Sequence, residues 1–271
     1  MKKYLICSDI DGTLMQSNHT IGEATLAKIH QLQADGHIFA VATGRMPVAA
    51  HEVAQSVGPL TNVIGSNGAY LATPEEEIIE VRLGREAAVI AYDILKKYDI
   101  PFFFFARKGI YYNQLSPKRF EPADRDRVYI KDDTAEIICV EDRDVFLQHA
   151  DEYMNAVAIS EDNLPALEQA RAELKQVASI HIESSRFNNI EVIPLHVNKG
   201  ETVKRLAAYH NIPIENTIAF GDGENDISML QAAGIGVAMG NAEDAIKAIA
   251  DVVTASNDEE GIVQFLDSIN L

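Results

Sequence analysis

Short apolar runs alternate with amphipathic helical segments at both ends of this chain of 271 residues. Residues 4–8 and 38–42 are near-continuous apolar runs, and residues 21–34 between them carry apolar side chains at helical spacing. The alternation returns between residues 199 and 254. Apolar strands joined by helices are typical of a parallel sheet that is covered on both faces. The sequence therefore predicts an α/β fold assembled from the two ends of the chain.

The middle of the chain has a different pattern. Residues 102–105 are four consecutive phenylalanines, residues 163–176 have helical spacing, and residues 181–193 resemble a closing hairpin. Strands and helices without regular alternation are typical of an α+β unit. We therefore predict a core formed by residues 1–82 and 190–271, with a smaller α+β domain inserted at residues 83–189.

The formal net charge of −18 restricts the partners of the chain. Such a surface repels nucleic acid and anionic membranes, so we expect neither as a partner. Any phosphate site must carry local positive charge. No apolar segment reaches the length of a membrane span, and the first apolar run is too short for a signal peptide. We therefore expect a cytoplasmic protein in which Cys7 and Cys139 are reduced.

Polar residues follow the predicted strands at the points where they end. Asp9 and Asp11 come directly after the first apolar run, and residues two apart on extended chain point to the same side. Further polar groups follow later strands at residues 43–45, 66–68 and 221–226. In an open parallel sheet, ligands bind outside the carboxyl ends of the strands. The sequence therefore predicts a binding site at this edge.

If the carboxylates of Asp9, Asp11, Asp222 and Asp226 converge there, their repulsion needs compensation. Two like charges 4 Å apart cost about 4 kcal/mol at an effective dielectric constant near 20. The cluster must therefore take up protons or bind a cation, and oxygen-only ligands together with a substrate phosphate favour Mg²⁺. No histidines or cysteines have the spacing of zinc ligands, and neither acidic loop has the glycine and glutamate positions of an EF-hand.

These motifs, taken in order, resemble a known family. Asp9-x-Asp11-Gly-Thr13, Thr43-Gly-Arg45, Lys199 and Gly221-Asp222-Gly-x-Asn225-Asp226 look like the four motifs of the haloacid dehalogenase (HAD) superfamily. The Val-Ala-Thr-Gly-Arg block at 41–45, Ser-Asn-Gly-Ala at 66–69 and Asn-Lys-Gly at 198–200 resemble its Cof-type phosphatase branch. The resemblance implies a Rossmann-like core with a type II cap inserted into it.

The resemblance also implies a role for each matching residue. Asp9 would be the nucleophile and a ligand of Mg²⁺. Asp11 would protonate the leaving oxygen and then deprotonate water, with its backbone carbonyl on the metal. Asp222 would be the third protein ligand, and Asp226 would orient the site. The residues implied in phosphate or substrate binding are Ile10, Thr43, Gly44, Lys199, Asn225, Arg45 and Asn67.

Two of these residues have simpler interpretations. Arg45 could instead form a surface ion pair, and Asn67 could simply make a turn with Gly68. Arg186 and Asn188, in the expected hairpin, are further candidates for substrate contact.

The function implied is a Mg²⁺-dependent phosphatase that hydrolyses a small phosphorylated metabolite, such as a sugar phosphate, through an aspartyl-phosphate intermediate. Two alternatives stay open at this point. One is a phosphotransferase or sugar-phosphate mutase, and the other is a non-catalytic metabolite sensor on the same scaffold. The sequence indicates neither the oligomeric state nor the physiological substrate.

Overall fold

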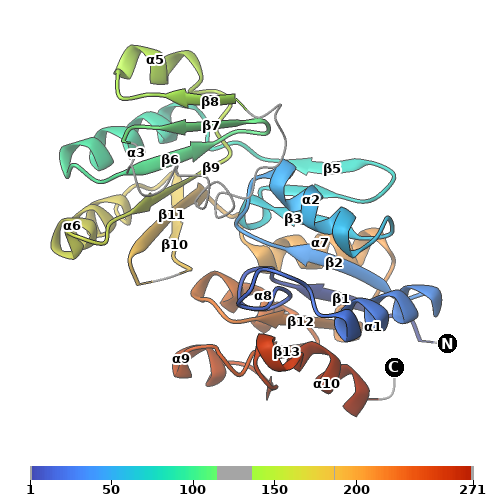
Figure 1. The fold of residues 1–271 in the computed structure, drawn as a ribbon. Helices are drawn as coiled ribbons and strands as arrows, with labels where there is room; N and C mark the ends of the chain where they lie inside the picture. The colour runs from blue at the N-terminus through green and yellow to red at the C-terminus, as the bar shows by residue number, and fades with distance from the viewer. Residues whose placement is uncertain (1, 115–135, 186, 270–271) are drawn as a thin grey trace. The chain divides into compact units, whose positions relative to one another are not determined.

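The structure is a computed structural model that describes residues 2–114, 136–185 and 187–269 (Figure 1). Contacts between residues divide the chain into two compact units. The core unit comprises Met1–Arg45, Ala50–Ile79 and Asn198–Leu271, and the inserted unit comprises Met46–Ala49 and Glu80–Val197. Among the described residues, no helix is both long and apolar enough to cross a membrane.

The core unit is built on an eight-stranded sheet with the order β14-β13-β12-β1-β2-β3-β4-β5. Its strands are β1 (Leu5–Ser8), β2 (Ile38–Ala42), β3 (Asn62–Gly65), β4 (Tyr70–Ala72), β5 (Glu77–Glu80), β12 (Thr217–Gly221), β13 (Ile235–Ala238) and β14 (Val252–Val253). The strands from β14 to β3 pair in parallel, and β4 is antiparallel to β3. The predicted α/β fold with a parallel sheet is confirmed.

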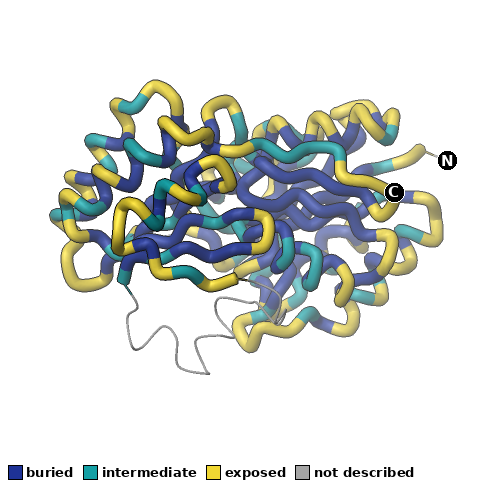
Figure 2. Tube along the Cα trace, turned by 90° about the horizontal axis from the view of Figure 1, so that it is seen from above, coloured by how far each residue is buried: buried dark blue, intermediate teal, exposed yellow. Residues whose placement is uncertain are grey.

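Strand β1 lies in the middle of this sheet, and its four residues are all buried. Ser8 at its end is level with Phe220 of β12 on one side and with Val41 of β2 on the other. Because the three strands are parallel and in this register, the loops that follow them leave the sheet at the same edge. Figure 2 shows the buried strands as continuous dark blue segments.

Helices cover both faces of the core sheet. On one face, α7 (Lys199–Tyr209), α8 (Ile227–Ala232) and α9 (Asp244–Lys247) contribute to an apolar cluster with Leu5, Cys7 and Ala40. On the other face, α10 (Gly261–Ser268) places Phe265 against Phe220, with ring centroids 5.6 Å apart. Further helical elements among the described residues of the core are α1 (Glu23–Ala34), α2 (Pro47–Val57), whose first three residues fall in the inserted unit, and the short 3₁₀ turns η1 (Ser66–Gly68), η2 (Ile214–Asn216), η3 (Glu224–Asp226) and η4 (Asn257–Glu259).

The inserted unit has its own six-stranded sheet, with the order β10-β11-β9-β6-β7-β8. The strands are β6 (Phe102–Phe105), β7 (Gly109–Tyr112), β8 (Glu136–Cys139), β9 (Asn155–Ile159), β10 (Ile180–Glu183) and β11 (Asn189–Pro194). Its helices, within residues 80–114, 136–185 and 187–197, are α3 (Arg85–Lys97), α5 (Arg143–Gln148) and α6 (Leu164–Leu174). Alternate rings of the phenylalanine block, Phe102 and Phe104, enter the apolar core beneath these helices.

The end of the inserted unit lies later in the chain than the sequence pattern indicates. Strand β11 pairs with β10 as the expected hairpin and also with β9, so residues 190–194 belong to the six-stranded sheet. The sequence pattern instead predicts that these residues belong to the core. Their backbone groups are instead hydrogen-bonded to the inserted unit on both sides, because β11 is an interior strand there.

One predicted helix is shorter than its pattern. The sequence favours a helix over 243–250 with Asn241 as its N-cap, but α9 spans only Asp244–Lys247 and begins after Glu243. The Asn241 side chain does not cap this helix. Its amide nitrogen donates instead to the backbone carbonyl of Gly12, 2.8 Å away.

Candidate active site

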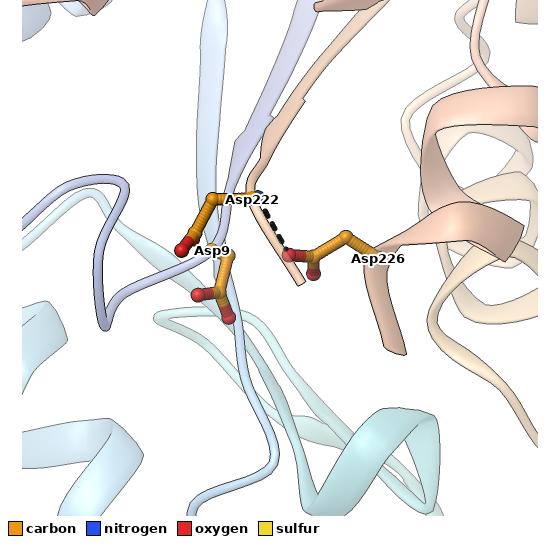
Figure 3. A group of neighbouring side chains, drawn as sticks. All are labelled: Asp9, Asp222 and Asp226. Atoms are coloured by element: carbon orange, nitrogen blue, oxygen red, sulfur yellow. Dashed lines mark hydrogen bonds between the residues drawn. The ribbon is translucent and has the colours of Figure 1, made fainter. Parts of the chain in front are cut away.

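Three carboxylates meet at the carboxyl edge of the core sheet. Asp9 follows β1, Asp222 follows β12, and Asp226 ends the η3 turn. One oxygen from each lies within 4.8 Å of the other two (Figure 3). The parallel pairing of β1 with β12 produces this arrangement, because the Asp9 amide donates to the Phe220 carbonyl at 3.0 Å and so sets the two strand ends side by side.

A buried lysine neutralises part of this charge. Lys199 is the first residue of α7, a helix capped by the Asn198 side chain. Its Nζ lies 2.7 Å from Asp9 Oδ1 and 2.7 Å from Asp226 Oδ1. Burial alone would lower the pKa of Lys199, but the carboxylates of Asp226 and Asp9 raise the pKa above its ordinary value. Lys199 is therefore an ammonium ion that bridges two carboxylates inside the protein.

One ammonium group does not balance three carboxylates. Burial and then Asp226 raise the pKa of Asp9 well above its ordinary value, against the opposing effect of Lys199. Burial and Asp226 likewise raise the pKa of Asp222 to about 6, although the Thr13 hydroxyl bond opposes the rise. The ionised cluster therefore lacks positive charge. Oxygen-only donors at this spacing suit a hard divalent cation, so the residues fit Mg²⁺ held by Asp9 and Asp222.

Asp226 orients the loop that carries Asp222. Its Oδ2 accepts hydrogen bonds from the backbone amides of Asp222 and Gly223, each at 3.0 Å. Gly221 makes this approach possible, since a Cβ atom there would lie 2.5 Å from Cβ of Asp226. Asp226 therefore joins Lys199, through its other oxygen, to the backbone beside Asp222.

Asp11 does not join the carboxylate cluster through its side chain. Arg45 holds it in a bidentate pair, with Nε 2.8 Å from Oδ2 and Nη2 2.5 Å from Oδ1. The Asp11 side chain is 43% exposed, whereas that of Arg45 is 9% exposed. Arg45 therefore forms an ion pair, which is the simpler of its two interpretations. Its partner, however, is Asp11, the residue expected to act as acid and base. Asp11 is expected to contact the metal through its backbone carbonyl. The ion pair of its side chain with Arg45 therefore does not affect that expectation.

The expected phosphate-binding residues lie beside one another in neighbouring loops. Asn225 Nδ2 donates to Asn67 Oδ1 at 3.2 Å, and the Asn67 amide donates to the Thr43 carbonyl at 3.0 Å. The Thr43 hydroxyl accepts the Arg45 amide at 3.2 Å, with Gly44 between them in the chain. Asn67 has a φ of 52° and its side chain is buried, so it does more than shape an exposed turn.

Other expected residues lie elsewhere. Ile10 is fully buried in the core unit. In the inserted unit, the Asn188 carbonyl accepts the Ser160 amide at 3.1 Å, and Arg186 lies outside the described residues.

Sequence reasoning missed two donors to Asp222. The Thr13 hydroxyl donates to Asp222 Oδ1 at 2.6 Å, and Asn241 Nδ2 lies 3.4 Å from Asp222 Oδ2. Thr13 could have been found from the sequence, because it is the last residue of the Asp9–Thr13 motif. Asn241 has no such signal, since an asparagine before a short helix predicts only a cap.

Parallel strands that end in a carboxylate cluster, together with an inserted α+β unit, define an α/β protein of two parts. The family model of the haloacid dehalogenase-like hydrolases matches residues 6–266. The chain therefore belongs to this hydrolase family, as its four motifs predict.

Relatives of known name cover almost all of the chain. It is 31% identical to the 5-amino-6-(5-phospho-D-ribitylamino)uracil phosphatase YitU of Bacillus subtilis, over 98% of this chain and 97% of the relative. It is 32% identical to the phosphatase YwpJ of the same organism, over 97% and 98% of the two chains. The pyridoxal phosphate phosphatase YbhA of Escherichia coli is 28% identical, over 99% of each chain.

Solved structures share the whole fold. A haloacid dehalogenase-like hydrolase from B. subtilis superposes with a TM-score of 0.86 at 29% identity, covering 98% of this chain and 100% of its own. The subclass IIB sugar phosphatase BT4131 superposes with a TM-score of 0.79 at 27% identity, covering 98% of each chain.

Proposed function

We propose that this enzyme is a Mg²⁺-dependent phosphatase that hydrolyses a small phosphorylated metabolite through an aspartyl-phosphate at Asp9. The observation that carries the proposal is the position of the Asp9 carboxylate. It is nearly buried, it is bound by the ammonium group of Lys199 at 2.7 Å, and it lies beside Asp222 and Asp226. A buried carboxylate fixed by a cation is suited to nucleophilic attack, because it is aimed and poorly solvated.

The charges around Asp9 suit attack on a phosphate. A carboxylate and a phosphate dianion repel each other, and Lys199 offsets part of that repulsion at the attacked group. Bound Mg²⁺, held by Asp9, Asp222 and the Asp11 carbonyl, would supply the remaining positive charge. Thr43, Gly44 and Asn225 would hold the other phosphoryl oxygens, because they occupy neighbouring loops at the same edge of the sheet. Phosphoryl transfer needs mainly such positioning and charge stabilisation.

Asp11 supplies the acid and base steps in this proposal. Its carboxyl group gives a proton to the leaving oxygen while the Asp9 oxygen bonds to phosphorus. It then takes a proton from the water that releases phosphate and restores Asp9. Arg45 binds both carboxylate oxygens of Asp11, so the pair must open before Asp11 can reach a leaving group.

The substrate is proposed by chemical class only. The named relatives act on 5-amino-6-(5-phospho-D-ribitylamino)uracil and on pyridoxal phosphate, and a structural neighbour is a sugar phosphatase. These compounds share a phosphate ester on a small polar molecule. We propose a substrate of this class for the chain as well.

The test measures phosphate release from a panel of sugar phosphates, pyridoxal phosphate, the ribitylaminouracil phosphate and para-nitrophenyl phosphate. We expect release with Mg²⁺, none with a chelator, and none from Asp9→Asn in either condition. Transfer of phosphate to an added hydroxyl compound, in place of release, would identify a phosphotransferase instead. Ligand binding without turnover would identify a sensor, and either result contradicts the proposal.

A further inference from the structure

The side chain of Asn241 links three separate segments of the core unit. Its amide nitrogen donates to the Gly12 carbonyl at 2.8 Å and lies 3.4 Å from Asp222 Oδ2. Its amide oxygen accepts the backbone N–H of Asn257 at 3.1 Å. An exposed asparagine side chain ordinarily forms hydrogen bonds with water. Three protein partners therefore indicate that the fold holds this side chain in a defined position.

The first partner, Gly12, is itself in contact with Asp222. Gly12 has a φ of +86°, and a Cβ atom at this position would lie 2.3 Å from Asp222 Oδ2. The turn after Asp11 therefore rests directly on the carboxylate. Asn241 lies at this junction and bonds to both sides of it, and its two amide hydrogens allow one bond to each.

Asn241 also completes the hydrogen bonding of Asp222. The Thr13 hydroxyl donates to Oδ1 at 2.6 Å, so the two carboxylate oxygens have neutral donors from different segments. Neutral donors fix the plane of a carboxylate without cancelling its charge. A carboxylate held in this way keeps its remaining lone pairs aimed in one direction, which is what a cation site requires.

The third partner ties the site to the C-terminal segment. The Asn257 side chain is buried, and its Nδ2 donates to the Met15 carbonyl at 2.8 Å. Asn241 and Asn257 therefore hold the carbonyls of Gly12 and Met15, on both sides of Thr13. This pair closes the loop that begins at Asp9.

We propose that Asn241 is a positioning residue that fixes the Asp222 carboxylate and the Gly12 turn for binding of the divalent cation. This inference rests on the proposed function, since the cation belongs to that function. Partners that orient a metal ligand typically change metal affinity about 10–100-fold when they are removed. The effect should therefore fall on cation affinity more than on turnover at saturating cation.

The test uses Asn241→Ala and the nearly isosteric Asn241→Leu. Isothermal titration calorimetry of the substrate-free proteins with MgCl₂ should show a dissociation constant about 10–100-fold above that of the wild type. The Mg²⁺ concentration for half-maximal activity should rise in parallel, while kcat at saturating Mg²⁺ is largely kept. The control is Glu243→Ala, an exposed residue two positions away whose side chain makes no cap bond, and it should bind Mg²⁺ like the wild type.

Thermal unfolding in chelator separates positioning from a merely structural role. Folded variants with wild-type Mg²⁺ affinity would overturn the inference. So would variants that are unfolded in chelator and not rescued by Mg²⁺, since the contact would then be structural. A wild-type protein without Mg²⁺-dependent phosphate release would instead overturn the proposed function.

Discussion

The ammonium nitrogen of Lys199 lies 2.7 Å from the carboxylate of Asp9, and both side chains are buried. The two residues are 190 positions apart in the chain. Lys199 is the first residue of α7, and Asp9 directly follows the central strand of the sheet. Lys199 also binds Asp226. The stability of the core and the proposed chemistry therefore both depend on the side chains of Lys199, Asp9 and Asp226.

Replacing this lysine should reduce both stability and turnover. Lys199→Met leaves the buried carboxylates of Asp9 and Asp226 without their cationic partner, and such a loss typically costs about 3–5 kcal/mol. Urea unfolding in chelator should show a decrease of this size, and phosphate release should be nearly abolished. Lys204→Met, which removes an exposed ion pair with Glu201 from the same helix, should cost about 0–1 kcal/mol. Equal unfolding midpoints for the two variants would show that the buried contact is not formed.

Asp226→Asn should lower kcat more than it raises KM. The carboxylate accepts from Lys199 through one oxygen and from two backbone amides through the other, and an amide group cannot do both. We expect a loss of about 1–3 kcal/mol in the free energy of unfolding, together with slower turnover. The control is Asp251→Asn, which removes the negative charge from the side chain that accepts the Gly236 amide. It should lower stability but leave turnover unchanged, and similar kinetic losses in both variants would contradict the positioning role of Asp226.

Asp11→Asn should slow turnover by about 10²–10⁴-fold with little change in stability. Asp11 is partly exposed, and asparagine keeps an oxygen that can accept a hydrogen bond from Arg45, so the change in stability should be small. Steady-state kinetics and thermal melting measure the two effects. Asp93 makes the same kind of bidentate pair with Arg143 on the surface of the inserted unit, so Asp93→Asn is a matched control with normal turnover expected. Normal turnover in Asp11→Asn as well would remove its acid–base role.

The metal-free protein should lose stability as the pH rises from about 4 to 6. Burial raises the pKa of Asp222 to about 6, above the ordinary value of 3.8. Within this window the folded state binds a proton that the unfolded state has released, so the free energy of unfolding falls with pH. Above pH 6 the loss is complete, on the order of 3 kcal/mol from this group.

Urea unfolding in chelator at pH 5 and pH 7.5 tests this pH dependence. The wild type should lose more stability between the two values than Asp222→Asn does, and added Mg²⁺ should stabilise the wild type more at pH 7.5 than at pH 5. An unchanged pH dependence in Asp222→Asn would contradict the buried position of this carboxylate.

The convergence of Asp9 and Asp222 could be predicted from the sequence, because the ends of parallel apolar strands meet at one edge. The hydrogen-bond partners of polar side chains such as Arg45 and Asn241 could not be predicted in this way. Arg45 can reach either a substrate or Asp11, and only the folded loops decide which. Asn241 bonds to a carbonyl 229 positions earlier in the chain, although its local sequence indicates a helix cap. A local sequence pattern also does not indicate the order of strands in a sheet. The position of β11 between β10 and β9 in the inserted unit is therefore known only from the structure.

The identity of the phosphorylated residue tests the central claim most directly. Asp11→Asn, mixed with substrate and Mg²⁺ and then quenched in acid, should accumulate an acyl phosphate. Borohydride reduction converts a phosphorylated aspartate to homoserine, which peptide mass spectrometry can locate. Our account predicts homoserine at position 9 and nowhere else, and none in the double variant that also carries Asp9→Asn. Phosphate on another residue, or continued turnover of the Asp9→Asn enzyme, would contradict it.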